Sequence, residues 1–198
     1  MFLGNSLTYS EGNIGCDASD SNHDYYHYIS EYMKSKNPSV QINPRTNISS
    51  WEQDETTSSR EDTFNKEIKP LLSADTNLVM LQLGDNVNTD ARKQSLENDS
   101  EELIKNIKLT CPQAQIYWIY GWFGDEQVFN SIEQACQNEQ ITSININDLN
   151  TKENQGTVGS TFLGLDGKTY TTNSGQAAHP GDKGHKAIAD RIISNFDF

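Results

Sequence analysis

Two nearly continuous apolar runs constrain the fold of this chain more than any other feature. The first covers residues 77–83 (N-L-V-M-L-Q-L) and the second covers residues 115–120 (Q-I-Y-W-I-Y). A strand with one solvated face alternates apolar and polar residues, whereas a strand buried on both faces is apolar almost throughout. Both runs therefore predict central strands of a parallel sheet that carries helices on its two faces.

Strand-like and helix-like segments alternate along the rest of the chain. Apolar residues at helical spacing predict helices over residues 24–33, 61–72, 96–109, 125–138 and 180–196. Shorter patterns predict further strands over residues 1–4, 40–43 and 141–149, and polar or irregular loops over residues 44–59 and 150–178. This order predicts a three-layer α/β/α sandwich with a central, mostly parallel, five-stranded sheet.

The length of 198 residues suits one sizeable core, and we expect a single domain over residues 1–198. The first apolar run, Met1-Phe2-Leu3-Gly4, is shorter than the typical strand of about five or six residues. We therefore expect that the first strand is truncated at its N-terminus and that an upstream segment has been removed. The compartment stays open, including an extracellular location or a place in a larger chain.

Composition excludes several classes of partner. The formal net charge of −13 argues against nucleic acid and anionic membranes, because both are polyanions, and it favours solubility. No run of 18 apolar residues is present, so the sequence predicts no transmembrane helix. Cys16, Cys111 and Cys136 show neither a CxxC motif nor metal-ligand spacing. They indicate buried or unreactive thiols, with a Cys111–Cys136 disulfide as the open alternative.

Three polar motifs lie at the ends of predicted elements. Ser6 follows the first strand on a glycine-led turn, Asn86 follows the strand over residues 77–83, and His179 precedes the last helix. Ligands of parallel α/β sheets gather at the carboxyl ends of the strands. A serine hydroxyl becomes a useful nucleophile only when a base takes its proton and donors hold the resulting oxyanion. The three motifs supply one candidate for each role.

These motifs resemble three blocks of the SGNH (GDSL) hydrolase family, and the resemblance covers the whole chain. The matching residues are Gly4-Asn5-Ser6-Leu7, Gly84-Asp85-Asn86 and His179-Pro180-Gly181-Asp182-Lys183-Gly184-His185. The resemblance implies a flavodoxin-like topology, with Ser6 as nucleophile and His179 as general base. It also implies that the Asn86 amide and the Ser6 N–H donate to the oxyanion, and that no metal or organic cofactor is required.

Two positions depart from the family pattern. The second block normally supplies a glycine N–H to the oxyanion, but residues 46–51 read T-N-I-S-S-W, so we assign this donor to the backbone of Ser49. The family's aspartate, three residues before the histidine, is Gln176 here. The side chain of Gln176, a backbone carbonyl or another carboxylate could orient the imidazole instead. The carboxylate candidates are Asp166, Asp182, Glu52 and Asp54.

Other chemically capable side chains have simpler interpretations. His185 lies on the apolar face of the last helix and is expected to be a packed, hydrogen-bonded core residue. His23 and His27 lie one helical turn apart, but no further ligand spacing supports a metal site. Trp122 and Trp51 are candidates for stacking on a sugar ring beside the site, and the alternative is that they fill the edge of the core.

The sequence predicts serine-dependent hydrolysis of a short acyl ester, and we expect the substrate to be a small molecule or a glycan. It has no extended apolar lid for long-chain lipids, so an acetyl group on a carbohydrate is the favoured substrate. Fold analogy also allows two alternatives. One is a carbohydrate O-acetyltransferase, which differs only in the acceptor. The other is a catalytically impaired carbohydrate-binding protein, which the missing aspartate favours.

Overall fold

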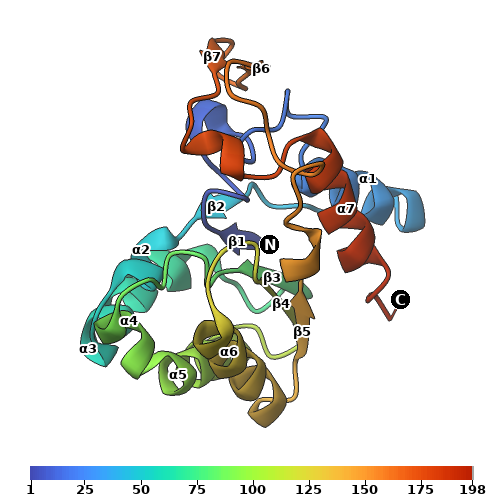
Figure 1. Ribbon diagram of the computed structural model, residues 1–198. Helices are drawn as coiled ribbons and strands as arrows, with labels where there is room; N and C mark the ends of the chain where they lie inside the picture. Colours follow the sequence, from blue (N-terminus) through green and yellow to red (C-terminus); the bar gives the residue numbers. More distant parts are fainter. Residues whose placement is uncertain (198) are drawn as a thin grey trace. The chain divides into compact units, whose positions relative to one another are not determined.

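The protein, described here by a computed structural model that covers residues 1–197, has an α/β fold with a five-stranded main sheet (Figure 1). The strand order β2-β1-β3-β4-β5 is that of a flavodoxin-like sheet. These strands are β1 (Phe2–Gly4), β2 (Thr46–Asn47), β3 (Leu78–Gln82), β4 (Gln115–Tyr120) and β5 (Thr142–Asn145). The β1–β2, β3–β4 and β4–β5 pairs are parallel, which confirms the predicted class and sheet.

Seven α-helices and several shorter helical turns are present within the described residues. The α-helices are α1 (Tyr25–Lys36), α2 (Ser49–Gln53), α3 (Thr57–Thr63), α4 (Asp90–Gln94), α5 (Leu96–Thr110), α6 (Glu126–Asn138) and α7 (Asp182–Ile193). A π-helical turn, η2 (Phe64–Ile68), and a 3-10 turn, η3 (Lys69–Leu71), continue α3. The other 3-10 turns are η1 (Glu11–Asn13), η4 (Asn147–Leu149) and η5 (Gln176–Ala178). No helix in residues 1–197 is long and apolar enough to cross a lipid bilayer.

The chain divides into two compact units. The first unit contains Met1 and residues 48–145, and the second contains residues 2–47 and 146–197. In the first unit, α5 packs on α6, and α6 contacts β4 and β5. The inner residues of β3 and β4 are fully buried, as their apolar composition predicts. Trp118 on β4 packs edge-on against Trp51 on α2, with 6.1 Å between ring centroids.

A buried ion pair ties the helices of the first unit together. Arg60 on α3 is 2 % exposed, and its guanidinium donates to Asp99 on α5 at 2.6 Å. The same guanidinium donates to the carbonyl oxygens of Trp51 and Arg92, and it lies over the Trp51 ring at 4.9 Å. A buried charge is tolerable when it is paired and hydrogen-bonded in this way. Arg60 therefore joins α3 to three other helices, α2, α4 and α5.

The second unit is organised around α1 and α7, which lie side by side (Figure 1). Asp24 caps α1 by accepting from the His27 N–H at 2.9 Å. Its other oxygen accepts from the Gly15 N–H and from Arg45, so one buried carboxylate joins three segments. His185 on α7 is fully buried and bonds the Cys16 carbonyl at 3.0 Å, which confirms its expected place in the core.

Several predicted boundaries are wrong. Residues 40–43 form no strand, because β1 pairs instead with Thr46 and Asn47. The predicted loop over residues 44–59 contains α2 and the start of α3, where a Thr56–Ser59 capping box begins the helix. The last helix begins at Asp182 rather than Pro180.

Two further predictions concern the loop over residues 150–178 and the cysteines. The loop holds a two-stranded antiparallel hairpin, formed by β6 (Thr161–Leu163) and β7 (Thr169–Thr171). All three cysteines are free and buried, so the Cys111–Cys136 disulfide does not form. Burial raises the pKa of Cys16 and of Cys136 to about 12, which makes both thiols unreactive.

Candidate active site

Ser6 lies in a tight turn directly after β1, in the second unit. The carbonyl of Asn5 accepts from the N–H groups of Thr8 and Tyr9, each at 3.0 Å. The side-chain oxygen of Asn5 also accepts from the Leu7 N–H at 3.1 Å. The buried Asn5 therefore closes the turn from both its backbone and its side chain, which fixes the partly exposed Ser6 between them.

Ser6 and His179 are brought together although they lie 173 positions apart in the sequence. The Oγ atom of Ser6 lies 3.0 Å from Nε2 of His179. His179 directly follows η5, and its backbone is held on both sides. Its N–H donates to the Gln176 carbonyl at 2.7 Å, and its own carbonyl accepts from the Gly156 N–H at 2.9 Å. The imidazole is thus presented to the serine from a fixed backbone.

The contact made by Nδ1 of His179 determines which of the two ring nitrogens carries the hydrogen. Nδ1 lies 3.0 Å from the main-chain carbonyl oxygen of Gln176. A carbonyl can only accept, so Nδ1 carries the hydrogen in the neutral ring and Nε2 carries the lone pair. That lone pair faces the Ser6 hydroxyl, which is the arrangement a general base needs. The main-chain carbonyl of Gln176 thus lies beside Nδ1, at the position that an aspartate carboxylate takes in a Ser-His-Asp triad.

The side-chain candidates for orienting His179 have other described partners. The Gln176 side chain bonds the Asn173 N–H and Glu11, and Asp182 accepts from the Ser19 N–H at 2.8 Å. Asp166 accepts from the Tyr170 hydroxyl at 2.6 Å. Two other candidates, Asp54 and Glu52, belong to the first unit. There Asp54 accepts from the Thr63 hydroxyl, and Glu52 bonds the turn that follows β3.

Asp17 is a carboxyl group near His179 that the sequence analysis missed. It is 7 % exposed and accepts from the Thr172 hydroxyl at 2.5 Å. Burial raises the pKa of Asp17 above its usual value, and the positive charge of His179 opposes this rise. Asp17 lies in a polar loop, and its φ is +68°. Its side chain packs so closely on Gly156 that any larger residue at position 156 would overlap Oδ2 of Asp17. The loop pattern alone gave no signal of this burial.

The turn formed by residues 84–86 follows β3 in the first unit and is held by an independent set of bonds. Gly84 has a φ of +126°, a conformation that favours glycine. Both Gly84, through its N–H, and Asn86, through its side-chain amide, donate to the carboxylate of Glu52. Asp85 accepts from the Phe123 N–H at 2.7 Å and from the Gln82 amide at 2.6 Å. The Asn86 side chain is therefore rigidly placed within its unit.

The remaining predicted site residues lie in the first unit. Ser49 is the first residue of α2 and is partly exposed. Trp51 is 2 % exposed and Trp122 is 0 % exposed. A ring that stacks on a sugar must present one face to solvent, and neither Trp122 nor Trp51 presents one in this structure. Both rings are buried in the core of the first unit.

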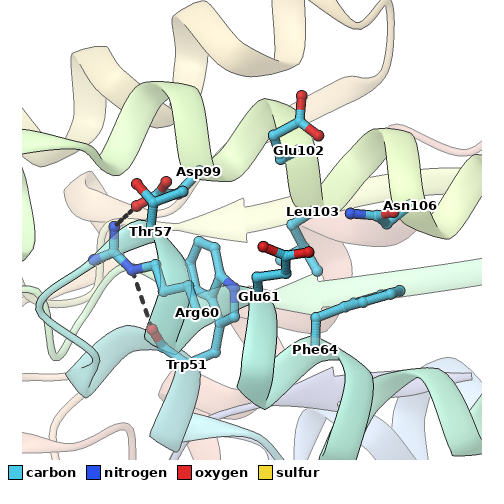
Figure 2. Close-up of a pocket in the computed structure, with 9 residues that line it drawn as sticks. All are labelled: Trp51, Thr57, Arg60, Glu61, Phe64, Asp99, Glu102, Leu103 and Asn106. Atoms are coloured by element: carbon cyan, nitrogen blue, oxygen red, sulfur yellow. Dashed lines mark hydrogen bonds and ion pairs between the residues drawn. The ribbon is translucent and has the colours of Figure 1, made fainter.

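A cavity of about 280 Å³ lies beside Trp51, between α3 and α5 (Figure 2). Figure 2 shows Arg60 bridging Trp51 and Asp99. The exposed residues Glu61 and Glu102 also line the cavity. Phe64 and Leu103 supply apolar surface. All the residues that line this cavity belong to the first unit. Within residues 1–197, no group of three His, Cys, Asp or Glu side chains is arranged to hold a metal ion.

Comparison with known proteins identifies the fold. No family model and no curated protein sequence matches the chain. Among solved structures, phospholipase A1 from Streptomyces albidoflavus has a TM-score of 0.62 at 14 % identity, covering 98 % of both chains. A GDSL-like lipase from Bacteroides uniformis also has a TM-score of 0.62, at 15 % identity, covering 98 % of this chain and 93 % of the other.

A carbohydrate-active enzyme is also similar in structure. A family two carbohydrate esterase from Clostridium thermocellum, solved in complex with cellohexaose, has a TM-score of 0.57 at 14 % identity. The match covers 98 % of this chain and 61 % of that one. Together with the GDSL-like lipase, it shows that the chain has an SGNH (GDSL) hydrolase fold, as the sequence motifs indicated.

Proposed function

We propose that the protein is a serine esterase with Ser6 as nucleophile and His179 as general base. The observation that carries this proposal is the hydrogen-bonded series Ser6 Oγ, His179 Nε2, His179 Nδ1 and the Gln176 carbonyl, with 3.0 Å at both contacts. A nucleophile within hydrogen-bond reach of a base, with the base oriented by a third group, is the signature of covalent catalysis. Here the third group is a neutral carbonyl.

The reaction follows from the proton positions in this series. The lone pair on Nε2 of His179 takes the Ser6 proton as Oγ attacks the ester carbonyl carbon, giving a tetrahedral oxyanion. The protonated ring then gives that proton to the leaving alcohol oxygen as its bond to carbon breaks, which leaves an acyl-Ser6 ester. Water, deprotonated by the same ring, then attacks the acyl carbon. The ring returns that proton to Ser6 Oγ as the bond between Oγ and the acyl carbon breaks, which releases the carboxylic acid and free Ser6.

The oxyanion donors in the proposal come from the sequence motifs. We assign them to the side-chain amide of Asn86 and to the N–H groups of Ser6 and Ser49. Donors aimed at developing charge are worth about 10²–10³-fold in kcat each. The neutral Gln176 carbonyl fixes the tautomer but carries no full charge to stabilise the imidazolium. In the proposed enzyme the imidazole is therefore oriented as in a Ser-His-Asp triad, but the imidazolium that forms during the reaction is stabilised less than it would be by a carboxylate.

For the substrate we propose a short acyl ester, with an acetyl group on a carbohydrate as the favoured case. Support comes from the similar family two carbohydrate esterase bound to cellohexaose and from a similar acetyl xylan esterase of Butyrivibrio proteoclasticus. The similar phospholipase A1 and lipases make chain length the property to measure. O-acetyl transfer and carbohydrate binding without catalysis are the competing outcomes of the same experiment.

The test measures the release of p-nitrophenol from p-nitrophenyl acetate and from p-nitrophenyl laurate, and the release of acetate from acetylated xylan. We expect hydrolysis of the acetyl esters and a loss of at least ~10³-fold in kcat for Ser6→Ala and His179→Ala. Ser39→Ala, which changes an exposed serine of the same unit, is the control and should keep full activity. Equal activity of Ser6→Ala and the wild type refutes the proposal. Product that appears only with an added glycan acceptor identifies a transferase, and binding of xylan without turnover identifies a binding protein.

A further inference from the structure

Glu52 is a buried acidic residue that accepts hydrogen bonds from the turn at residues 84–86 in the first unit. It lies on α2 and its side chain is fully buried. One carboxylate oxygen accepts from the Gly84 N–H, and the other accepts from Nδ2 of Asn86 at 2.7 Å. Burying a carboxylate costs several kcal/mol unless hydrogen bonds compensate for the lost water. Glu52 makes these compensating bonds to the turn that carries the proposed oxyanion donor.

The bond between Glu52 and Asn86 fixes the orientation of the Asn86 amide. The oxygen and the NH₂ group of an asparagine have nearly the same shape, so packing alone does not distinguish the two flipped states. In this structure Nδ2 of Asn86 donates to a carboxylate oxygen of Glu52, which holds the amide in the state in which Nδ2 faces Glu52. One amide hydrogen is then held by Glu52, and the second points away from it. In the flipped state, Oδ1 of Asn86 would occupy the position of Nδ2 and could not donate a hydrogen bond from there.

We infer that Glu52 is a positioning residue, which holds the Asn86 amide in the one flip state that can donate to an oxyanion. This inference rests on the proposed function, because it assigns Asn86 the donor role. It replaces the earlier interpretation of Glu52 as an orienting acid for His179. The class of reaction it serves is acyl transfer through a tetrahedral oxyanion.

The backbone of the turn is held by groups other than Glu52. Asp85 accepts from the Phe123 N–H and the Gln82 amide, and Arg92 donates to the Asn86 carbonyl at 3.1 Å. A change at Glu52 therefore leaves three bonds that keep the turn in place. The Asn86 amide, by contrast, would lose the contact that selects its flip state. This separation makes the role of Glu52 testable without removing the turn.

Glu52→Gln is the informative substitution because it keeps the shape and removes the charge. The oxygen of the new side-chain amide can accept from the Gly84 N–H, which leaves the NH₂ group of that amide facing Nδ2 of Asn86. Two donors face each other in that arrangement, so the Asn86 amide is driven to flip. Coulomb's law alone predicts the opposite effect on rate, because a negative charge near an oxyanion opposes it. A fall in kcat would therefore report positioning rather than charge.

The test is a double-mutant cycle on p-nitrophenyl acetate hydrolysis, with Glu52→Gln, Asn86→Ala and the double variant. We expect Asn86→Ala to lower kcat about 10²-fold, and Glu52→Gln to lower it at least tenfold while KM stays within twofold. In the Asn86→Ala background, the Glu52 substitution should change kcat less than threefold, because no amide is left to orient. Glu55→Gln removes an equal charge from an exposed position three residues away and should have no effect.

The outcomes separate the inference from the proposed function. Unchanged or increased kcat in Glu52→Gln, with the expected loss in Asn86→Ala, overturns the inference alone. Multiplicative losses in the double variant also overturn it, because Glu52 would then act on something other than the amide. Full activity of Asn86→Ala removes the donor role itself. If Glu52→Gln does not fold, Glu52→Asp, which keeps both acceptor oxygens on a side chain shorter by one methylene, enters the same cycle and should lose kcat in the same non-additive way.

Discussion

The buried His185 should make the protein sensitive to mild acid. Its Nδ1 accepts from the Tyr25 N–H at 3.4 Å, so Nε2 carries the proton that is donated to the Cys16 carbonyl at 3.0 Å. The ring is thus neutral in the folded state. Protonation of Nδ1 would set its new N–H against the Tyr25 N–H, so that two hydrogen-bond donors would face each other. Burial lowers the pKa of His185 below 6.5, and the nearby charge of Asp24 opposes this shift only in part.

The sign and size of the effect follow from proton linkage. In the unfolded chain His185 binds a proton near its ordinary pKa of 6.5, whereas in the folded state it binds one only at lower pH. The unfolded state therefore holds more protons between these two values. The free energy of unfolding should fall by up to ~1.4 kcal/mol for each pH unit below 6.5, until the lowered pKa is reached. Above pH 6.5 this contribution is fully present.

Urea unfolding at pH values from 7.5 to about 5 measures this slope. The informative quantity is the difference between the wild type and His185→Gln, whose side chain can still accept and donate but does not titrate. We expect the variant to be less stable at pH 7.5 and to lose less stability on acidification. Equal slopes for the wild type and His185→Gln would refute the reasoning.

Three further substitutions test other parts of the account. Gln176→Asp should keep kcat on p-nitrophenyl acetate within tenfold, because the main-chain carbonyl and not the side chain bonds the His179 ring. A loss of several orders of magnitude would show that the side chain orients this ring. Arg60→Met should lower the free energy of unfolding, measured in urea, by about 3–5 kcal/mol, because it removes the cation that pairs with the buried Asp99 carboxylate. The double variant with Asp99→Leu should recover part of this lost stability. Gly84→Ala should lower the free energy of unfolding by about 1–3 kcal/mol, because φ is +126° and the new Cβ would lie 2.7 Å from Ile132; unchanged thermal stability would contradict this.

Sequence patterns predicted the parts of the fold that depend on periodic burial. The apolar run over residues 115–120 coincides with β4, and the helix expected over residues 96–109 differs from α5 by one residue. The strand expected over residues 40–43 failed because a short alternating pattern does not say which residues pair. The observed β2 is the two-residue Thr46–Asn47, and its position depends on pairing with β1. Such long-range pairing has no local signal.

The candidate site shows a similar division. Ser6 and His179 were recognisable because their chemistry lies in their side chains and their motifs end predicted elements. The group that orients His179 was not, because it is the main-chain carbonyl of Gln176, and every residue has a carbonyl. The contact of Glu52 with the turn at residues 84–86 was not predicted, because its helix, α2, falls in a segment whose sequence indicated a polar loop. The residues around Trp122 likewise do not indicate that its ring is buried, although it follows the end of a strand.

The claim that Ser6 is a nucleophile activated by His179 can be measured directly by covalent labelling. An alkyl fluorophosphonate reacts with an activated serine, and peptide mapping by mass spectrometry locates the adduct. The account predicts one adduct on the peptide that contains Ser6, no adduct in Ser6→Ala, and labelling slowed by at least ~10²-fold in His179→Ala. An unlabelled wild type, an adduct on another residue, or equal labelling of Ser6→Ala would contradict it.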